Sequence, residues 1–232
     1  MIFSHNFEIG VENANAFGEI TNKFILQCLE NAATLHAIKV GDENSGVREG
    51  DIGWVLMQWK MSVLRRPKYG EKITVQTWTR NNRQFLRDYE VYVGDELAVS
   101  ASSRWILVDI KNVKILRFTP EYTDKYEPID KTVPEENLKR LKELDDYSKS
   151  ANFAIRKSDI DVNQHMHNLN YLDMAKEVIS WDRELNNLEI AYKKQIKYGE
   201  KIKVFGAEQD GKFFVKVINS ETGELKTLIE LQ

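Results

Sequence analysis

The sequence predicts an α+β protein built from two similar units in tandem, each made of one helix and an antiparallel sheet. Residues 21–40 carry apolar side chains at helical spacing, and runs of alternating or β-branched residues follow them. The same order, a helix and then strands, recurs after residue 150. The hexapeptide KYGEKI occurs twice, at residues 68–73 and 197–202, at the same place in each half. A repeat in equivalent positions indicates a duplicated module.

The first half is predicted to fold as a helix packed on a sheet. The helix at residues 21–40 has one apolar face, which includes Cys28, and it ends at Gly41. The predicted strands are residues 3–9, 57–63, 73–79, 85–93 and 97–109, with a hairpin turn at 94–96. One long helix with a run of such strands favours an antiparallel sheet that the helix covers.

The second half repeats this plan after a segment rich in proline and charge. Residues 119–150 are typical of a linker, and residues 135–144 favour a short helix within it. The elements predicted beyond it are a strand at 152–156, a helix at 168–181 and strands at 188–196, 201–207, 212–219 and 225–231. We therefore place the first unit at residues 1–130, the linker at 131–150 and the second unit at 151–232.

The bulk composition is that of a globular protein. The chain has 232 residues, 42% of them hydrophobic and 30% charged, and a net charge of −3, so only a local basic patch would bind an anionic partner. Residues 1–12 lack the features of a signal peptide, and no apolar run is long enough to span a bilayer. One cysteine, Cys28, excludes an intramolecular disulfide framework, and no Cys/His cluster of metal-site type occurs. We expect a cytoplasmic protein that binds neither nucleic acid nor membrane.

The densest polar chemistry lies in residues 159–171, DIDVNQHMHNLNY, on a loop that leads into the second predicted helix. Asp161, Asn163 and His165 occupy alternate positions, so an extended loop would bring their side chains to one face. An acid, an amide and an imidazole beside a helix N-terminus are the groups that acyl transfer needs. This loop is therefore the candidate active site.

A structural interpretation of the same stretch stays open. Asparagine and aspartate are common in turns and at helix starts, and Asn168 or Asn170 would cap the second helix without any catalytic role. Exposed histidines near a helix start are also common.

The pattern D-V-N-Q-H-x-x-N-x-x-Y at residues 161–171 closely resembles the signature of acyl-carrier-protein (acyl-ACP) thioesterases, the plant fatty-acyl enzymes and their bacterial relatives. It also resembles, more broadly, the pattern of hotdog-fold acyl-CoA thioesterases. The resemblance covers nearly the whole chain and extends to residues 7–10, 54–55, 66–70 and 101–105. It implies two tandem hotdog modules, each a long helix wrapped by an antiparallel sheet.

The resemblance also implies roles for individual residues. Asp161, Asn163 and His165 match the family's catalytic acid, amide and imidazole. Asp161 would act as a general base for water or attack the thioester directly, His165 would relay a proton or orient water, and Asn163 would hold the nucleophilic group or the developing oxyanion. The implied catalytic set is completed by Gln195, and the implied substrate-binding residues are Asn168 and Tyr171.

Gln195 stands where the family has an acidic residue, in a stretch like Tyr-Lys-Lys-Glu. A glutamine hydrogen-bonds a water molecule but does not accept its proton at neutral pH. The neighbouring position holds a cysteine in plant relatives and Ile196 here, which excludes a thiol nucleophile at that position.

The first unit is predicted to lack the catalytic groups. Aligning the two helices places Glu12, Ala14 and Ala16 opposite Asp161, Asn163 and His165. The first unit would then be non-catalytic, and the resemblance implies that it forms the channel for the acyl chain.

The function that these observations favour is hydrolysis of fatty acyl-ACP, without a metal or organic cofactor. The partner would be acyl carrier protein, which carries the acyl group on its phosphopantetheine. The carrier protein is acidic and would dock on basic residues. Two clusters qualify: Arg65, Arg66 and Lys68, and Lys193, Lys194 and Lys197. The alternatives are an acyl-CoA thioesterase of the same superfamily and a non-catalytic acyl-thioester-binding module. A hotdog dehydratase is a weaker alternative than these two. Both a monomer and a homodimer are compatible with exposed sheet edges.

Overall fold

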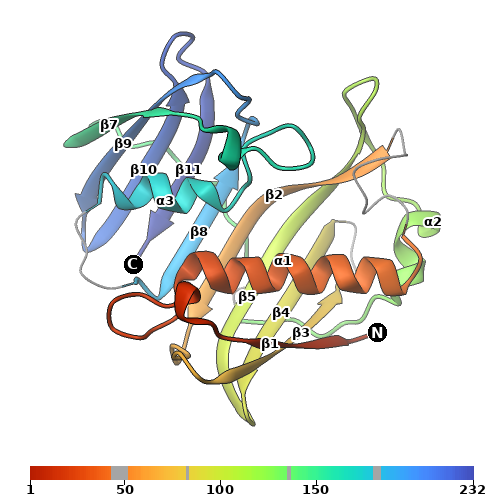
Figure 1. Ribbon diagram of the computed structural model, residues 1–232. Helices are drawn as coiled ribbons and strands as arrows, with labels where there is room; N and C mark the ends of the chain where they lie inside the picture. The colour runs from red at the N-terminus through yellow and green to blue at the C-terminus, as the bar shows by residue number, and fades with distance from the viewer. Residues whose placement is uncertain (43–51, 82–83, 135–136, 180–183) are drawn as a thin grey trace. The chain divides into compact units, whose positions relative to one another are not determined.

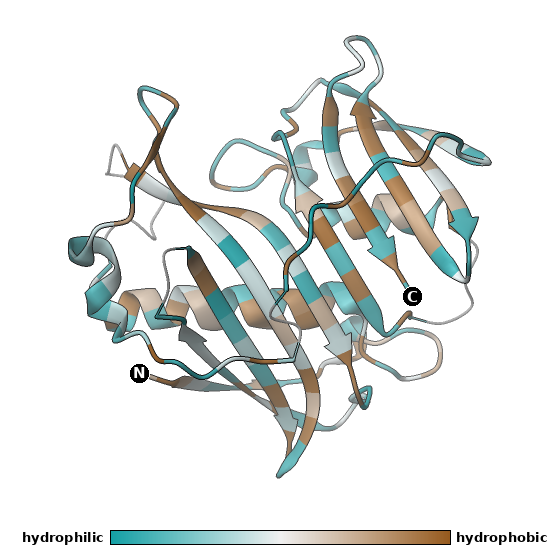
Figure 2. Cartoon of the chain, turned by 180° about the vertical axis from the view of Figure 1, so that it is seen from behind, coloured by the Kyte–Doolittle hydropathy of each residue, from teal (hydrophilic) through white to brown (hydrophobic). Residues whose placement is uncertain are grey.

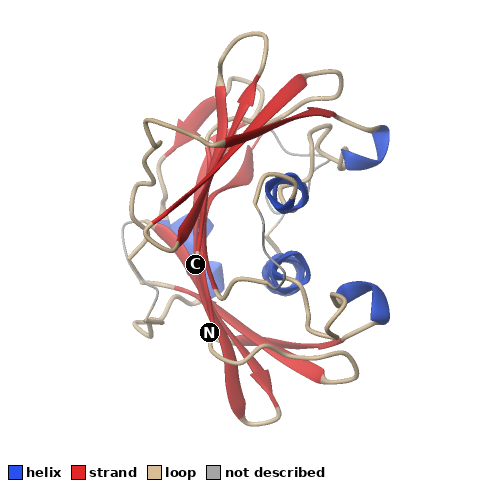
Figure 3. Ribbon diagram, turned by 90° about the vertical axis from the view of Figure 1, so that its left-hand side faces the viewer, coloured by secondary structure: helices blue, strands red, loops and turns tan. Residues whose placement is uncertain are grey.

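The computed structural model describes residues 1–42, 52–81, 84–134, 137–179 and 184–232. The chain divides into two compact units, Met1–Leu138 and Lys139–Gln232. In each unit one helix lies against one face of an antiparallel sheet (Figures 1 and 3). The predicted α+β class and the tandem hotdog arrangement are confirmed.

The first unit contains the longer helix and the longer strands. Its elements are β1 (Phe3–Glu8), a 3-10 turn (Val11–Asn13), α1 (Asn22–Lys39), β2 (Ile52–Val63), β3 (Lys72–Thr79), β4 (Phe85–Val93), β5 (Glu96–Asp109), β6 (Lys114–Leu116), α2 (Pro120–Thr123) and a 3-10 turn (Asp124–Tyr126). The strands pair antiparallel in the order β1-β3-β4-β5-β2, and β6 pairs with β5. All the strands predicted for this half are present, whereas β6 and α2 were not predicted.

Helix α1 forms where the periodicity predicted it. The Thr21 hydroxyl accepts a hydrogen bond from the Phe24 N–H (3.1 Å) and caps the N-terminus, and Gly41 follows the C-terminus with a φ of +68°. The apolar face of α1 is buried against β3 and β1, and Cys28 on that face is 1% exposed. Cys28 is therefore a core residue.

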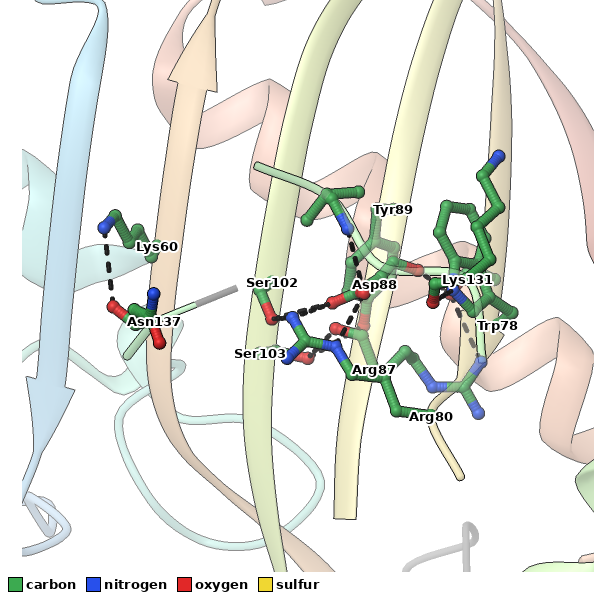
Figure 4. A network of polar contacts seen from close by, with 12 residues as sticks. Lys60, Trp78, Arg80, Arg87, Asp88, Tyr89, Ser102, Ser103, Lys131 and Asn137 are labelled. Carbon is green, nitrogen blue, oxygen red and sulfur yellow. Dashed lines mark hydrogen bonds and ion pairs between the residues drawn. The ribbon is translucent and has the colours of Figure 1, made fainter. Parts of the chain in front are cut away.

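A buried ion pair lies within the sheet of the first unit (Figure 4). The Arg80 guanidinium donates to both carboxylate oxygens of Asp88 at 2.7 and 2.6 Å, and the Ser102 hydroxyl donates to the same carboxylate at 2.8 Å. Asp88 also accepts from the Val133 N–H at 3.3 Å. The segment that includes Val133 is thus attached to the face of the first sheet by a charged hydrogen bond.

The second unit has the same plan with a shorter helix. Its elements are β7 (Lys149–Ala154), a 3-10 turn (Lys157–Asp159), α3 (Asn170–Lys176), β8 (Asn187–Tyr192), β9 (Lys201–Gln209), β10 (Lys212–Asn219) and β11 (Leu225–Leu231). The strands pair antiparallel in the order β8-β11-β10-β9-β7. Figure 2 shows apolar and polar residues alternating along these strands, the pattern of a sheet with one covered face.

Two helix predictions for the second half were wrong, one in its extent and the other over the part of its range that the structure describes. The helix expected at 168–181 ends at Lys176, and the N–H groups of Val178 and Ile179 bond to the Ala175 carbonyl in a turn. β-Branched Val178 and Ile179 are weaker helix formers than the residues before them. The helix expected at 135–144 is absent over 137–144, the part of that range the structure describes.

A glycine allows the end of this helical segment to approach the sheet. A Cβ at Gly206, on β9, would lie 2.6 Å from the Val178 carbonyl oxygen. Only glycine permits that contact without a shift of backbone. Among the residues that the structure describes, no helix combines the length and apolar character needed to cross a membrane.

Candidate active site

The repeated hexapeptide forms the same turn in both units. Gly70 and Gly199 both have a φ of +87°, a conformation that favours glycine. The Lys68 N–H donates to the Glu71 carboxylate at 2.8 Å, and the Lys197 N–H donates to the Glu200 carboxylate at 2.8 Å. Identical sequence therefore gives identical local structure, and Glu200 holds the turn beside the candidate site.

The polar loop is a tight turn and not an extended segment, so the predicted alternation of side chains was wrong. The Asp161 N–H donates to the His165 carbonyl (2.8 Å), and the Gln164 N–H donates to the Asp161 carbonyl (3.0 Å). Gln164 has a φ of +64°, which closes the turn. The turn places Asp161 and His165 opposite each other, with Asn163 exposed at its tip.

The Asp161 carboxylate has a structural role in this turn. Its Oδ1 accepts from the Asn163 N–H at 2.8 Å and, more weakly, from the His165 N–H at 3.5 Å. This is the side-chain-to-backbone bond by which aspartate and asparagine hold turns. These bonds fix the orientation of Oδ1. They do not use Oδ2, the other oxygen of the carboxylate.

Backbone hydrogen bonds hold the loop against the segment that carries Gln195. The Met166 N–H donates to the Ile196 carbonyl at 2.7 Å, and the His167 N–H donates to the Asp159 carbonyl at 2.9 Å. Gln195 itself is exposed. The loop and the residue after Gln195 are therefore direct neighbours, although they are about thirty positions apart in the chain.

His165 is half-buried and its Nδ1 atom has no hydrogen-bond partner within the described part of the chain. Burial lowers the pKa of His165 below its ordinary value of 6.5. Asp161 and Glu200 raise this pKa and Lys197 lowers it, without reversing the effect of burial. A pKa below 6.5 leaves the imidazole mainly neutral at pH 7, and its Nδ1 atom is buried in the loop.

Neither asparagine at the helix start caps α3, so that hypothesis was wrong. The N-cap position is Leu169 and makes no side-chain cap. Asn170 instead donates from Nδ2 to the Asp159 carbonyl at 3.3 Å, and the Asn168 carbonyl accepts from the Tyr192 hydroxyl at 3.4 Å. Both bonds connect the loop to its neighbours.

Tyr171 is buried, with 2% of its surface exposed. Its hydroxyl donates to the Lys194 carbonyl at 3.4 Å, and its ring packs on Tyr192 with 5.6 Å between centroids. Burial raises the pKa of this phenol. These contacts give Tyr171 a role in fixing the segment before Gln195.

The first unit contains the same loop, and its hydrogen bonds correct the predicted alignment. The Asn15 N–H donates to the Glu19 carbonyl (2.8 Å), and Asn15 Oδ1 accepts from the Phe17 N–H (2.9 Å). Gly18 has a φ of +73° at the position of Gln164. The equivalents of Asp161, Asn163 and His165 are therefore Asn15, Phe17 and Glu19, three residues beyond those predicted. The predicted alignment was made on the helices, and helical periodicity does not give the length of the loop before each helix. The hydrogen bonds of the loop do give that length.

Sequence reasoning overlooked two polar residues next to the site, Glu200 and Lys226. The Glu200 carboxylate accepts from Asn219 Nδ2 at 2.8 Å and from the ammonium of Lys226 at 2.7 Å. Burial opposes its ionisation, but these bonds and the Lys197 N–H keep the pKa of Glu200 below its ordinary value. The repeat pointed to Glu200, whereas nothing in the sequence distinguishes Lys226 from other strand lysines.

Nearly the whole chain is similar to known proteins. The family model described as "Acyl-ACP thioesterase N-terminal domain" matches residues 1–126, and "Acyl-ACP thioesterase C-terminal domain" matches residues 142–232. The oleoyl-acyl carrier protein thioesterase of Coriandrum sativum is 22% identical over 219 residues, which are 84% of this chain and 58% of that protein. The palmitoyl-acyl carrier protein thioesterase of Cuphea hookeriana is 25% identical over 218 residues, 84% of this chain and 52% of that protein. The chain thus spans about half the length of these relatives.

Solved structures show the same fold. The acyl-ACP thioesterase from Bacteroides thetaiotaomicron has a TM-score of 0.88 at 22% identity, covering 99% of this chain and 96% of the other. The 12:0-ACP thioesterase from Umbellularia californica has a TM-score of 0.87 at 19% identity, covering 100% and 96%. At these identities the similarity establishes the fold alone.

Proposed function

Since this chain belongs to the acyl-ACP thioesterase family, we propose that it hydrolyses the thioester of fatty acyl-ACP and releases a free fatty acid and the carrier thiol. The observation that carries the proposal is the turn whose backbone bonds hold Asp161 across from half-buried His165, close enough for the Asp161 carboxylate to act electrostatically on the imidazole. A carboxylate and a neutral imidazole beside each other are able to activate water for attack on an acyl carbon.

The proposed reaction uses only water besides this chain and its substrate. Asp161 accepts a proton from water as the water oxygen attacks the acyl carbon, or Asp161 attacks that carbon itself and forms an acyl anhydride that water then hydrolyses. In either route the carbon–sulfur bond breaks, the water oxygen ends in the fatty acid, and the phosphopantetheine sulfur leaves and receives a proton from water. Neutral His165 orients the water or carries the proton between these positions. Both routes require the ionised carboxylate of Asp161.

We assign supporting roles to the other residues predicted for the site. Asn163 and Gln195 are both exposed. In the proposed mechanism Asn163 donates to the acyl oxygen, and Gln195 orients water as an amide. Asn168 and Tyr171 shape the substrate site through the contacts of the loop with Tyr192 and Lys194.

The first unit is proposed to contribute the acyl-chain channel and not the chemistry. At the three equivalent loop positions it has an amide, a phenyl ring and a carboxylate: Asn15, Phe17 and Glu19. It therefore lacks the carboxylate–imidazole pair of Asp161 and His165. The division into a channel unit at 1–130, a linker at 131–150 and a catalytic unit at 151–232 remains a proposal, as do the cytoplasmic location and the oligomeric state.

The lysines of the second unit are proposed as the docking site for acyl carrier protein. Lys193, Lys194 and Lys197 are all exposed. In the first cluster, by contrast, Arg65 is paired with Glu71 at 2.7 and 2.5 Å, and Arg66 donates to Asn22 at 2.9 Å. Residues already engaged within the unit have less to offer an acidic partner.

The test is hydrolysis of matched acyl-ACP and acyl-CoA series by the purified protein. We expect turnover of acyl-ACP, and a lower kcat/KM for acyl-ACP but not for acyl-CoA when Lys193 and Lys194 are replaced together by alanine. Equal or faster turnover of acyl-CoA would move the assignment to an acyl-CoA thioesterase. Binding of both substrates without turnover would establish a non-catalytic acyl-thioester-binding module.

The titration of His165 is expected to have its midpoint below pH 6.5. Burial lowers its pKa, so the neutral imidazole persists to lower pH than in an unfolded chain. If the neutral ring is the active form, kcat rises with pH through that midpoint. NMR of the imidazole protons, assigned with His165→Gln, measures the midpoint, and kcat over the same pH range provides the comparison. Lys197→Met should raise the midpoint and Glu200→Gln should lower it, and a midpoint above 6.5 would contradict the expectation.

A further inference from the structure

Lys226, on β11, is a buried cation with an unusual set of partners. Only 3% of the residue is exposed. Its ammonium donates to the Gln195 carbonyl at 3.1 Å and bonds to the carboxylates of Glu200 and Glu224 at 2.7 and 2.8 Å. Three acceptors match the three N–H donors of an ammonium, so the buried charge is fully hydrogen-bonded.

The same residue also binds the segment before Gln195 through its backbone. The Lys226 carbonyl accepts from the Lys193 N–H at 2.8 Å and from the Lys194 N–H at 3.2 Å. This double contact replaces the regular strand ladder and ends β8 at Tyr192, although the strand was predicted to continue to Ile196. Side chain and backbone of Lys226 together hold three successive residues, Lys193, Lys194 and Gln195.

The other contacts of this segment come from the candidate site itself. Tyr171 donates to the Lys194 carbonyl, and the Met166 N–H donates to the Ile196 carbonyl. The segment of residues 193–196 therefore has Lys226 as a neighbour on one side, and on the other side the polar loop together with α3. The interactions that hold Lys226 in place therefore also hold Gln195 in its position relative to His165.

The first unit provides a comparison within the same chain. There the residue that accepts two successive N–H groups is Ala98, bonded to Leu64 and Arg65 at 2.9 and 3.0 Å. The glutamate of the repeat, Glu71, pairs with Arg65, whose side chain is 35% exposed. In the second unit the equivalent glutamate, Glu200, pairs with Lys226 instead. In the first unit the cation that pairs with this glutamate is Arg65, on a partly exposed segment. In the second unit it is Lys226, on the buried strand β11, where it also donates to the Gln195 carbonyl.

We propose that Lys226 is a positioning residue for the active site, acting through Gln195 and Glu200. The inference rests on the proposed thioesterase function, and it assigns to the second unit a device that the non-catalytic unit lacks. The side chain of Ala98 offers the first unit neither a charge nor a link to the Arg66 carbonyl, because a methyl group has no hydrogen-bond donor. Displacement of catalytic groups by about 1 Å is enough to slow a reaction about a hundredfold.

The test is Lys226→Met, with Lys226→Arg as rescue and Lys212→Met as matched control. Lys212 pairs with Glu230 on the same sheet, toward the opposite end of β11, and is 39% exposed. We expect kcat for acyl-ACP to fall about 10- to 100-fold in Lys226→Met, with KM changed less than about threefold. Lys226→Arg should recover most of the loss, and Lys212→Met should match the wild type. If Lys226→Met does not fold, Lys226→Gln, which retains an N–H donor, takes its place.

Hydrogen exchange provides a readout that does not depend on turnover. The amides of Lys193, Lys194 and Met166 should exchange at least about tenfold faster in Lys226→Met than in the wild type, whereas those of the hairpin between β9 and β10 should not change. Unchanged exchange at these three amides, or wild-type kcat in a folded variant, would overturn the proposed role. Absence of turnover in the wild type would refute the thioesterase function separately, and the exchange result would still decide whether Lys226 holds the segment.

Discussion

Asp161→Asn is expected to lower kcat for acyl-ACP about a thousandfold without unfolding the protein. The loss is the usual size for removing a general base or a carboxylate nucleophile. The fold should persist because Oδ1 of Asp161 acts in the turn as a hydrogen-bond acceptor, which an asparagine replaces. Asn15 in the first unit already does so, accepting from the Phe17 and Glu19 N–H groups at 2.9 and 3.1 Å.

The measurement is steady-state kinetics on acyl-ACP together with thermal unfolding. Asn15→Asp is the matched control, since it places a carboxylate in the equivalent turn of the first unit and should leave kcat within about twofold of the wild type. A fall in kcat that is accompanied by a comparable loss of stability would make Asp161 a structural residue. Retention of more than about a tenth of the activity would exclude it as base and as nucleophile.

Asp88→Ala is expected to lower the free energy of unfolding by about 3–5 kcal/mol, the usual cost of removing one partner of a buried ion pair. Asp88 is 0% exposed, and Arg80 would keep its charge in the core without the carboxylate that neutralises it, while its bond to the Ser102 hydroxyl (2.9 Å) remains (Figure 4). Burial raises the pKa of Asp88 even though Arg80 and Ser102 oppose that shift. The intact pair therefore adds little net stability, and the cost of the substitution arises from the charge left behind.

Urea unfolding of the whole chain measures this difference. The control is Glu8→Ala, because Glu8 and Lys72 form a pair whose side chains are 82% and 78% exposed and whose loss should cost less than about 1 kcal/mol. Replacing both members with apolar residues, Asp88→Leu with Arg80→Met, should recover most of the loss. A double variant as unstable as Asp88→Ala would show that packing, and not the unpaired charge, causes the loss.

The elements with a strong local signal were predictable from the sequence. The period of residues 21–40, with Thr21 before it and Gly41 after it, located α1 within one residue. Strands β4, β10 and β11 have the predicted ends, because alternation and the glycine turns between strands are local properties. The repeated hexapeptide predicted a duplicated turn, and both copies have it. The candidate residues were found by the same kind of local pattern.

What the tertiary structure decided is the set of contacts between residues far apart in the chain. The end of β8 depends on the carbonyl and the ammonium of Lys226, which lie more than thirty positions beyond the residues of the 193–195 segment that they bind. The alignment of the loop in the first unit with the loop in the second unit depends on the hydrogen bonds inside each loop. The spacing of apolar residues along the helices does not report these bonds. By itself the sequence determined two α+β modules and the residue types of a thioesterase loop, because these follow from neighbours along the chain. Only the tertiary structure decided which backbone groups hold that loop, because a buried N–H or C=O must find its partner wherever the fold places one.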